Sequence, residues 1–315
     1  MKDKIAMIHR PCPICASRDE SNVFAEENFD LTRLDQFAFA SRKIPENMHL
    51  RLILCPTCDT LYSNPIPAPK TISKAYHEAA FDSSEEARYA ARTYGKFLPS
   101  IKKNLPGTFG ALDIGTGDGA FLSELVEHGF SGIVGVEPSL APIKVASPKI
   151  KGMIKHGLFK PLDFKKDSFS LVTCFQTFEH LEDPLKMCRG AYRILRKNGI
   201  FFIIVHNRRS LSEKLLGMKS PIYDIEHLQI YSPASAKFLM EKAGFKQVEV
   251  KVLYNTYPLH YWLKVLPFPR KAKEILITIL KKVGVGFLPI SLPAGNMAVI
   301  GYKKQPDYLT ETLKT

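Results

Sequence analysis

The sequence predicts an α/β protein in which a doubly wound, seven-stranded and mostly parallel sheet follows a small cysteine-bearing module. Three observations predict this class. From Phe109 onward, apolar runs typical of strands alternate with helical patterns, which is the signature of a parallel sheet. A turn containing Gly115, Gly117 and Gly119 joins the first of these strands to a helix, as in doubly wound folds. Ahead of it, four cysteines form two C-x-x-C pairs, which predicts a separate small module.

The elements of the sheet domain follow from apolar periodicity and from stop signals. The expected strands are 109–114, 132–136, 153–154, 168–175, 200–205, 248–254 and 295–302. The helix after the glycine turn has Leu122, Leu125 and Val126 on one face and ends at Gly129. Further helices are expected over 72–100, from about 141, and over 184–195, where Lys197-Asn198-Gly199 is the stop.

The glycine turn predicts a ligand site. Three glycines let the backbone turn sharply and approach a ligand closely, because no Cβ intervenes. The N-terminus of the following helix offers N–H groups that lack partners within the helix and the positive end of its dipole. Asp113 lies inside the strand, and the second apolar run ends at Glu137, which suits hydrogen bonding to ribose hydroxyls. The G-x-G-x-x-A spacing also fits a dinucleotide fingerprint, but we find no nicotinamide-facing site for an oxidoreductase.

Three stretches together resemble class I S-adenosylmethionine-dependent methyltransferases: L-D-I-G-T-G-D-G, then V-E-P-S, then F-Q-T-F-E-H-L-E-D-P. The resemblance covers roughly 106–245 and the last strand, and it implies the Rossmann-like methyltransferase fold with S-adenosyl-L-methionine as cofactor. The cofactor-binding residues it implies are Asp113, Gly115, Thr116, Gly117, Glu137, Pro138, Leu158, Phe159 and Phe175. At Leu158 the family often has an acid that holds the adenine amino group. Leucine cannot accept that bond, so a backbone carbonyl or Asp163 is expected to serve.

The acceptor site should lie at the carboxyl ends of strands four and five, beside the cofactor. The family resemblance places an E-H-x-x-x-[FY]-S stretch after strand five, facing the acceptor, and here it supplies His227 and Tyr231. His227 is therefore the first candidate for the general base and His206 the second, with Tyr231 beside them. The alternatives are a structural capping role for His227 and a loop-shaping backbone bond for His180.

The cysteine pairs Cys12-Pro-Ile-Cys15 and Cys55-Pro-Thr-Cys58 predict a structural zinc site with four thiolates and no open coordination position. The alternatives are a redox dithiol or buried free thiols. About 39 residues separate the pairs, and they should hold a strand pair around 23–29 and 50–54. Cys174 and Cys188 are expected in the core.

The domain boundaries follow from composition. Residues 1–69 form the zinc-ribbon-like module, which ends at the connector with Pro65, Pro67 and Pro69. Residues 70–105 form a helical segment that covers the cofactor, in which Tyr76 and Tyr94 are expected to pack. The methyltransferase domain spans 106–304 with a helical insertion at about 256–292, and 305–315 form a tail. The insertion contains an amphipathic helix with Leu276, Ile279, Leu280 and Val283 on one face. Through 257–285 it could rest on an anionic membrane, cover the acceptor site or contact a partner subunit.

Charge and composition bound the function. Lys and Arg number 44 against 31 Asp and Glu, a net charge of +13, which suits nucleic acid, an anionic membrane surface or phosphorylated substrates. No secretory signal and no apolar run of roughly 18–20 residues is present, so we expect a cytoplasmic protein with peripheral contact to the inner membrane surface as an option. The favoured function is methyl transfer to a small-molecule acceptor, a sugar or glycan precursor. RNA methylation and a non-catalytic zinc- and cofactor-binding scaffold are the alternatives.

Overall fold

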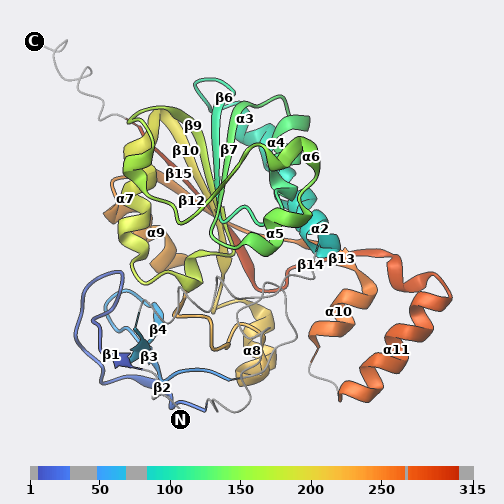
Figure 1. Cartoon of the computed structure of the whole chain (residues 1–315). Coiled ribbons are helices and arrows are strands. Elements are labelled where there is room, and N and C mark those ends of the chain that lie inside the picture. Colours follow the sequence, from blue (N-terminus) through green and yellow to red (C-terminus); the bar gives the residue numbers. More distant parts are fainter. Residues whose placement is uncertain (1–5, 29–47, 69–83, 267–268, 305–315) are drawn as a thin grey trace, which may run out of the picture.

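A central seven-stranded sheet organises the molecule, and the computed structural model describes residues 6–28, 48–68, 84–266 and 269–304. The strands of the sheet are β6 (Phe109–Ile114), β7 (Ser131–Glu137), β8 (Ile154–His156), β9 (Phe169–Phe175), β10 (Leu195–His206), β12 (Lys246–Val252) and β15 (Asn296–Tyr302). Their order is β12-β15-β10-β9-β6-β7-β8 (Figure 1). β15 runs antiparallel to both of its neighbours, whereas β10, β9, β6, β7 and β8 pair in parallel. The predicted fold class is therefore confirmed.

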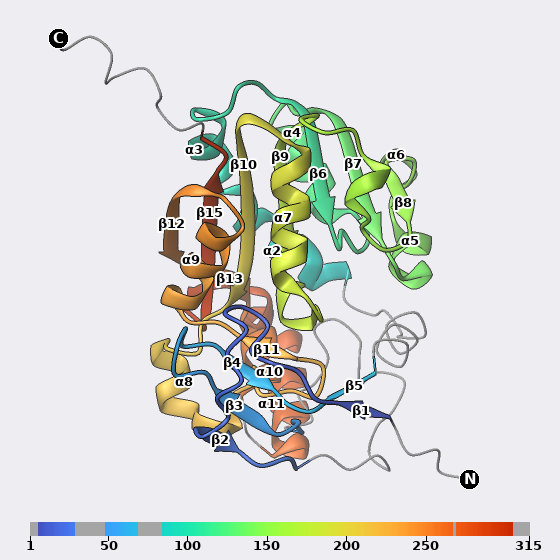
Figure 2. The same cartoon turned by 90° about the vertical axis from the view of Figure 1, so that its left-hand side faces the viewer.

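Helices cover both faces of this sheet (Figures 1 and 2). They are α2 (Ser84–Gly95), α3 (Leu98–Lys102), α4 (Ala120–Glu127), α5 (Leu140–Val145), α6 (Pro148–Lys151), α7 (Pro184–Ile194) and α9 (Pro233–Lys242). Short 3-10 turns lie at η2 (Pro161–Asp163), η3 (Phe178–His180) and η4 (Gly217–Lys219), beside α8 (Leu211–Leu216).

Successive apolar side chains of β10 point to opposite faces of the sheet, so the strand needs helices on both sides. Phe201, Ile203 and Val205 pack into one core cluster with residues of α7 and α9. Phe202 and Ile204 point the other way and pack with residues of α2, α3 and α4. Both sets are apolar and buried, as expected for a central strand of a parallel sheet.

The cysteine module consists of the described residues 6–28 and 48–68. It contains β1 (Met7–Ile8), β2 (Val23–Ala25), β3 (Leu52–Leu54), β4 (Leu61–Ser63) and β5 (Ile66–Pro67). Its four-stranded sheet has the order β11-β4-β3-β2, and its fourth strand, β11 (Gln229–Ile230), comes from the sheet domain. The two parts of the chain thus share one sheet, with the module below the carboxyl ends of the central strands in Figure 1.

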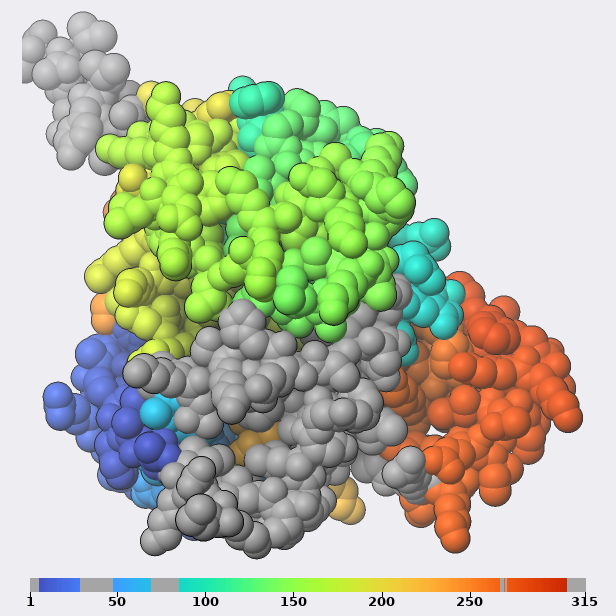
Figure 3. All heavy atoms as spheres, viewed as in Figure 1, coloured from blue at the N-terminus to red at the C-terminus, as the bar shows by residue number. Residues whose placement is uncertain are grey.

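The insertion between β12 and β15 forms an arm, defined here as residues 255–292. A two-stranded ribbon, β13 (Asn255–Pro258) with β14 (Pro289–Leu292), forms its base. The ribbon carries α10 (Leu259–Val265), α11 (Arg270–Lys282) and the turn η5 (Val285–Phe287). In Figure 3 the arm stands out from the body in orange. No helix in the described part of the chain is long and apolar enough to cross a bilayer.

Some expectations fall outside the described ranges. Residues 72–83 of the expected first helix, with Tyr76, and the 305–315 tail lie there. Tyr94 of α2 lies within the described residues. It is buried, and its ring centroid lies 4.8 Å from that of Phe175.

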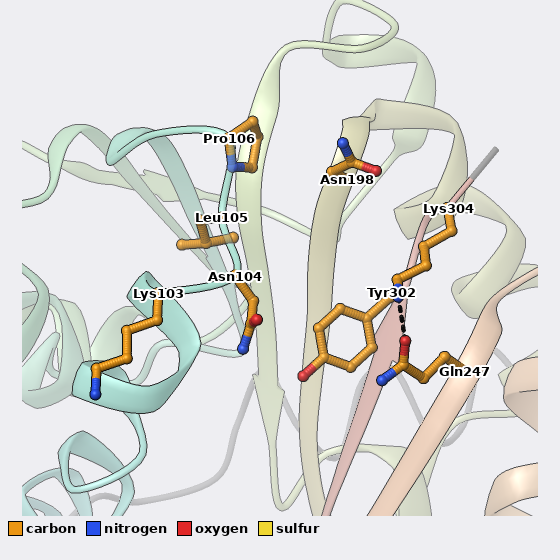
Figure 4. Close-up of a pocket in the computed structure, with 8 residues that line it drawn as sticks. All are labelled: Lys103, Asn104, Leu105, Pro106, Asn198, Gln247, Tyr302 and Lys304. Carbon is orange, nitrogen blue, oxygen red and sulfur yellow. Dashed lines mark hydrogen bonds between the residues drawn. The ribbon is translucent and has the colours of Figure 1, made fainter.

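A small cavity of about 210 Å³ lies at the end of the sheet where β10 begins (Figure 4). Lys103, Asn198, Gln247 and Lys304 are among its lining residues, and Lys304 Nζ donates to Gln247 Oε1. Ligands of open α/β sheets bind at the opposite, carboxyl ends of the strands, so we look for the functional site there.

Candidate functional site

A large cavity of about 950 Å³ lies at the carboxyl ends of β6, β7, β9 and β10. Its walls contain all nine residues predicted to bind the cofactor: Asp113, Gly115, Thr116, Gly117, Glu137, Pro138, Leu158, Phe159 and Phe175. They also contain two of the three predicted catalytic residues, His206 and His227. The structure therefore brings residues from distant parts of the chain to one place.

The glycine turn between β6 and α4 needs its glycines for conformation. Gly115 has φ 73° and Gly117 has φ 59°, a left-handed region that disfavours side chains. A Cβ at Gly115 would lie 2.6 Å from Thr177 Oγ1, whereas at Gly117 it would enter open space. The turn thus presents bare backbone to the cavity at Gly117.

Glu137, at the end of β7, holds this turn in place. Its Oε2 accepts a 2.8 Å hydrogen bond from the Gly117 amide, and its Oε1 accepts one of 2.8 Å from the Ser139 amide. A carboxylate has about four lone-pair sites, so this one can accept further bonds from a diol. Burial raises the pKa of Glu137 above its ordinary value, although the two amide bonds oppose that shift.

Asp113 of β6 lines the same pocket and is buried. Its Oδ1 accepts a 2.6 Å hydrogen bond from Thr173 Oγ1. Burial raises the pKa of Asp113 to about 7, against the lowering effect of the Thr173 bond. Its charge can therefore change near neutral pH.

Polar atoms beside the cavity fit a polar ligand. Ser139 Oγ and Gln176 Nε2 are buried and have no hydrogen-bond partner among the described residues, and both residues line the cavity. Leu158 and Phe159 supply an apolar wall next to Pro138, whereas Asp163 is not among the lining residues. The expectation that a backbone carbonyl or Asp163 holds the adenine amino group therefore stays a prediction.

Three histidines, His180, His206 and His227, line the same cavity and form the histidine cluster. The His227 ring centroid lies 5.0 Å from that of His180 and 5.1 Å from that of His206. His227 Nδ1 lies 2.7 Å from the Ile222 carbonyl oxygen, and His180 Nδ1 lies 3.1 Å from the Glu226 carbonyl oxygen. If each Nδ1 donates, both rings keep Nε2 as the basic nitrogen.

The three histidines are not equivalent. Burial, and secondarily the neighbouring His180, lowers the pKa of His206 to about 4, so His206 stays neutral at neutral pH. Beneath it, the buried Glu179 accepts a 2.5 Å bond from the His206 amide, and burial raises the pKa of Glu179 to about 7. His180, Glu226 and His227 have ligand atoms within 4.8 Å of one another, close enough to hold a metal ion.

Tyr231, the third predicted catalytic residue, does not reach the cavity. It is fully buried, and its hydroxyl donates a 3.1 Å bond to the Phe178 carbonyl. Burial raises its pKa well above the ordinary value for tyrosine. The structure therefore gives Tyr231 a packing role behind η3 and no place on the cavity wall.

The four cysteines of the two C-x-x-C pairs gather in the cysteine module, with their sulfurs within 4.8 Å of one another. Cys12 Sγ lies 3.5 Å from Cys58 Sγ, and Cys15 Sγ lies 3.4 Å from Cys55 Sγ. A tetrahedral zinc ion with Zn–S distances of about 2.3 Å separates its sulfurs by roughly 3.8 Å. None of the four is in a disulfide, so the cluster fits zinc.

The cysteine module grips the segment that carries His227. Arg10, two residues before Cys12, donates to the carbonyl oxygens of Ser63, Glu182 and Leu228. The Ser63 amide donates to the Leu228 carbonyl at 2.8 Å, and Ser63 Oγ donates to the His227 carbonyl at 3.3 Å. These bonds hold the backbone on the C-terminal side of His227.

The residue after the second C-x-x-C pair binds the loop after β10. Asp59 follows Cys58 directly and has φ 62°. Its carboxylate accepts from Arg208 and, at 2.8 and 2.6 Å, from the guanidinium of Arg209. Arg208 comes two residues after His206, so both candidate bases stand on backbone that the cysteine module fixes.

The sequence reasoning missed several lining residues. Glu226, Asp224, Glu213, Asn255 and Asn296 line the cavity, as do Tyr257, Tyr261 and Trp262 of the arm. Glu226 directly precedes His227, and that adjacency was the available signal. For the arm, cover of the acceptor site was one of three options, but no local signal singled out Tyr257, Tyr261 or Trp262, because their place depends on the ribbon that folds the insertion back.

The chain is similar in sequence to known methyltransferases. The model of a family described as "Methyltransferase domain" matches residues 83–250. A "probable S-adenosylmethionine-dependent methyltransferase" of Mycolicibacterium smegmatis is 28% identical over 138 residues, which cover 43% of this chain and 51% of that protein. The ubiquinone biosynthesis O-methyltransferase of Histophilus somni is 29% identical over 107 residues, 31% of this chain and 44% of that protein. The chain thus spans about half the length of these relatives.

A solved S-adenosylmethionine-dependent methyltransferase from Archaeoglobus fulgidus overlaps 68% of this chain and 94% of its own, with 19% identity and a TM-score of 0.46. That score is too low to add weight. The family match rests instead on more than half of the chain, and it spans the glycine turn, Glu137 and the histidine cluster. The chain belongs to the methyltransferase-domain family.

Proposed function

We propose that the protein is an S-adenosylmethionine-dependent methyltransferase that acts on a small hydroxyl-bearing acceptor, with the sugar part of a glycan precursor favoured. The observation that carries the proposal is the shared cavity, in which the glycine turn and Glu137 lie together with the histidine cluster. When bound, the cofactor supplies an activated methyl group on a sulfonium. The chain's own residues then position the acceptor and remove its proton.

Polar groups at the acceptor end favour a sugar. His180, His206, Asp224, Glu226 and His227 converge there, and Asn255 and Asn296 add amide groups. Such a set can donate to and accept from several hydroxyls of one ring. No Lys or Arg is among the described residues that line the cavity, whereas grooves for single-stranded nucleic acid are basic, which disfavours RNA as acceptor.

His227 is our choice for the general base. Its Nδ1 is oriented by the Ile222 carbonyl, so Nε2 is the nitrogen that would take the acceptor proton. His206 is the weaker candidate, because a pKa of about 4 makes its imidazole a poor proton acceptor. Glu226 and His180 would hold the remaining hydroxyls.

His227→Asn is expected to lower kcat by about 10²–10⁴-fold, the usual contribution of a general base. Asparagine can still donate to the Ile222 carbonyl but lacks the basic nitrogen, so cofactor affinity should stay within about threefold of wild type. The matched control is His128→Asn, because His128 also bonds a backbone carbonyl through Nδ1 but lies outside the cavity. Single-turnover kinetics and calorimetric titration measure both quantities. Unchanged kcat in His227→Asn would remove the base assignment.

Added metal ions together with His180→Ala separate proton transfer from metal binding. A divalent ion on His180, Glu226 and His227 would lower the pKa of a bound acceptor hydroxyl instead of removing its proton directly. The proposal expects dialysed enzyme to need no added Mg²⁺, Mn²⁺ or Zn²⁺ beyond the metal of the four cysteines. Activity that depends on such an ion and fails in His180→Ala would make the trio a ligand set.

Asp113 predicts a pH dependence of cofactor binding. Its carboxyl is neutral below a pKa of about 7 and ionised above it, and the cofactor's methionine portion carries positive charge. Binding of S-adenosylmethionine should therefore tighten by up to about tenfold from pH 6 to pH 8, with release of a proton. Titration calorimetry in buffers of different ionisation enthalpy measures both. Asp113→Asn should flatten this dependence, and a wild-type affinity that falls over the same range would contradict the assignment.

The direct test of the function is transfer of a labelled methyl group. Zinc-loaded protein is incubated with methyl-labelled S-adenosylmethionine and, in parallel, with nucleotide-linked sugars, lipid-linked sugars and total RNA. Label in a sugar fraction, absent with His227→Asn, is the expected result. Label in RNA alone would replace the sugar by RNA, and failure to bind S-adenosylmethionine would end the enzyme proposal.

We also propose that the four cysteines bind one structural Zn²⁺. Cys12, Cys15, Cys55 and Cys58 would use all four coordination positions, so the ion supplies rigidity and no chemistry. Because the module bonds to the segments around His206 and His227, its rigidity would also fix the positions of these two histidines.

A further inference from the structure

The residues that line the large cavity include two groups of different chemistry. The polar group is the histidine cluster with Glu226. The apolar group, called here the apolar end, consists of Leu211, Leu215, Leu216, Tyr261, Trp262, Val265 and Leu266. Leu211 and Leu215 of α8 are 70% and 77% exposed, so this part of the cavity wall reaches the surface.

The arm supplies four residues of the apolar end, and α8 supplies the other three. In α10, Trp262 Nε1 donates a 2.9 Å bond to the Ile290 carbonyl of β14, and His260 Nδ1 lies 2.9 Å from the Gly286 carbonyl. These bonds fix α10 against the ribbon with Tyr261, Trp262 and Val265 on the cavity wall. Small-molecule sites typically enclose about 300–1,000 Å³, and this cavity must hold cofactor and acceptor together. An acceptor with a long apolar portion can extend through this end.

The second helix of the arm has an apolar face that nothing in the described structure covers. None of the residues of α11 whose exposure is described is buried. Ile275, Leu276, Ile279 and Val283 are 62%, 41%, 53% and 64% exposed, and Phe287 and Leu288 in the following turn are 48% and 55% exposed. At 100° per residue, Ile275, Ile279 and Val283 form one stripe along the helix.

Basic residues border this stripe. Lys271 and Lys282 are exposed on α11 along one edge of this stripe, and the whole chain carries a net charge of +13. An apolar stripe edged by lysines is the pattern of a helix that lies in the interface of an anionic bilayer. A protein partner would need acidic groups arranged around an apolar groove. An anionic bilayer offers acidic headgroups above an apolar interior over its whole area.

We propose that the arm docks on an anionic lipid surface through the α11 stripe and that the acceptor is a sugar carried on a long apolar chain. The chain would enter past Leu211, Leu215 and Val265, and the sugar would reach the histidine cluster. The acceptor half rests on the proposed function, whereas the docking half does not.

Docking is tested by co-sedimentation with vesicles. Wild-type protein is expected to bind vesicles of phosphatidylcholine with 30% phosphatidylglycerol at least tenfold more tightly than pure phosphatidylcholine, with weakening in high salt. The triple variant Ile275→Ser/Ile279→Ser/Val283→Ser should lose at least tenfold of this affinity and keep its affinity for S-adenosylmethionine. The control Val145→Ser/Val252→Ser changes two valines of the body that are 57% and 60% exposed, and it should bind like wild type.

Two results would overturn the docking half. One is equal vesicle binding by wild type and the triple variant. The other is a dimer in sedimentation equilibrium that the triple variant abolishes while vesicles bind neither protein, which would make the stripe a subunit contact.

The acceptor half is tested without turnover, because Trp262 is the one tryptophan of the chain and lines the cavity. Its fluorescence is followed during titration of the S-adenosylhomocysteine complex with methyl, hexyl and octyl glucoside, each below its micelle concentration. Each buried methylene contributes to binding, and burial of about half of the octyl chain would make octyl glucoside bind about 100-fold more tightly than methyl glucoside. Val265→Asp should reduce that ratio at least fivefold. Equal affinities for the three glucosides would overturn the apolar-chain proposal, and vesicle binding would remain a separate result if methyl transfer itself failed.

Discussion

Glu137→Ala is expected to weaken S-adenosylmethionine binding by about 100- to 1,000-fold. Two effects add in the same direction. The variant loses the carboxylate that would hold the ribose hydroxyls, at about 1.5–3 kcal/mol for each charge-assisted bond. It also releases the Gly117 and Ser139 amides that Glu137 now holds at 2.8 Å each, so the glycine turn loses its brace.

Titration calorimetry with S-adenosylmethionine, S-adenosylhomocysteine and NAD measures this effect. Glu127→Ala is the matched control, because Glu127 is an exposed acid at the end of α4 and should leave binding unchanged. Glu137→Gln should fall between wild type and Glu137→Ala, since an amide keeps one acceptor oxygen. Tight binding of NAD, with no response to either sulfur compound, would contradict the assignment of the pocket.

Removal of the metal from the four cysteines is expected to abolish turnover while cofactor binding persists. A structural zinc ion contributes on the order of 10 kcal/mol of folding free energy to a small module. Without the ion, Arg10 and Asp59, which lie beside the two C-x-x-C pairs, lose their fixed positions. The backbone beside His206 and His227 is then no longer held. The glycine turn keeps its bond to Glu137, which belongs to the sheet domain. We therefore expect kcat to fall at least about 100-fold, with S-adenosylmethionine affinity within about threefold.

Two variants make this test specific. Cys58→Ser should lose the metal and the activity, whereas Cys188→Ala changes a buried cysteine outside the cluster and should retain one zinc per chain by mass spectrometry. Asp59→Ala should keep the metal but free Arg208 and Arg209, with part of the same loss in kcat. Full activity in metal-free protein would refute the coupling, and loss of cofactor binding in Cys58→Ser would show that the whole domain depends on the module.

The parts predictable from sequence were those encoded in short stretches. The glycine turn, the acid at Glu137 and the strands around them depend on neighbours in the chain, and the structure has β6 over Phe109–Ile114, as expected. The strand ends predicted the place of His180 and His206, whereas that of His227 could be predicted only through the family resemblance. The strength of their burial, and so the low pKa of His206, depends on β10, β15 and the loop that carries His227.

The parts that could not be predicted depend on contacts between distant residues. Tyr231 lies four residues after His227, which suggested that both would face one site. The short strand β11 instead turns Tyr231 into the core, because Gln229 and Ile230 pair with Tyr62 and Leu61. A two-residue strand such as Gln229–Ile230 has no periodicity from which to predict that it pairs with a strand more than 160 residues away.

That shared sheet also constrains how the protein is made. A chain emerging from the ribosome presents the cysteine module first and β11 much later. Until Gln229–Ile230 appears, β4 has an open edge, and such edges invite pairing with the wrong strand. The knuckles can capture metal early and keep the nascent module compact during this interval. We therefore expect zinc limitation during synthesis to lower the yield of soluble protein more than zinc removal from the finished molecule does.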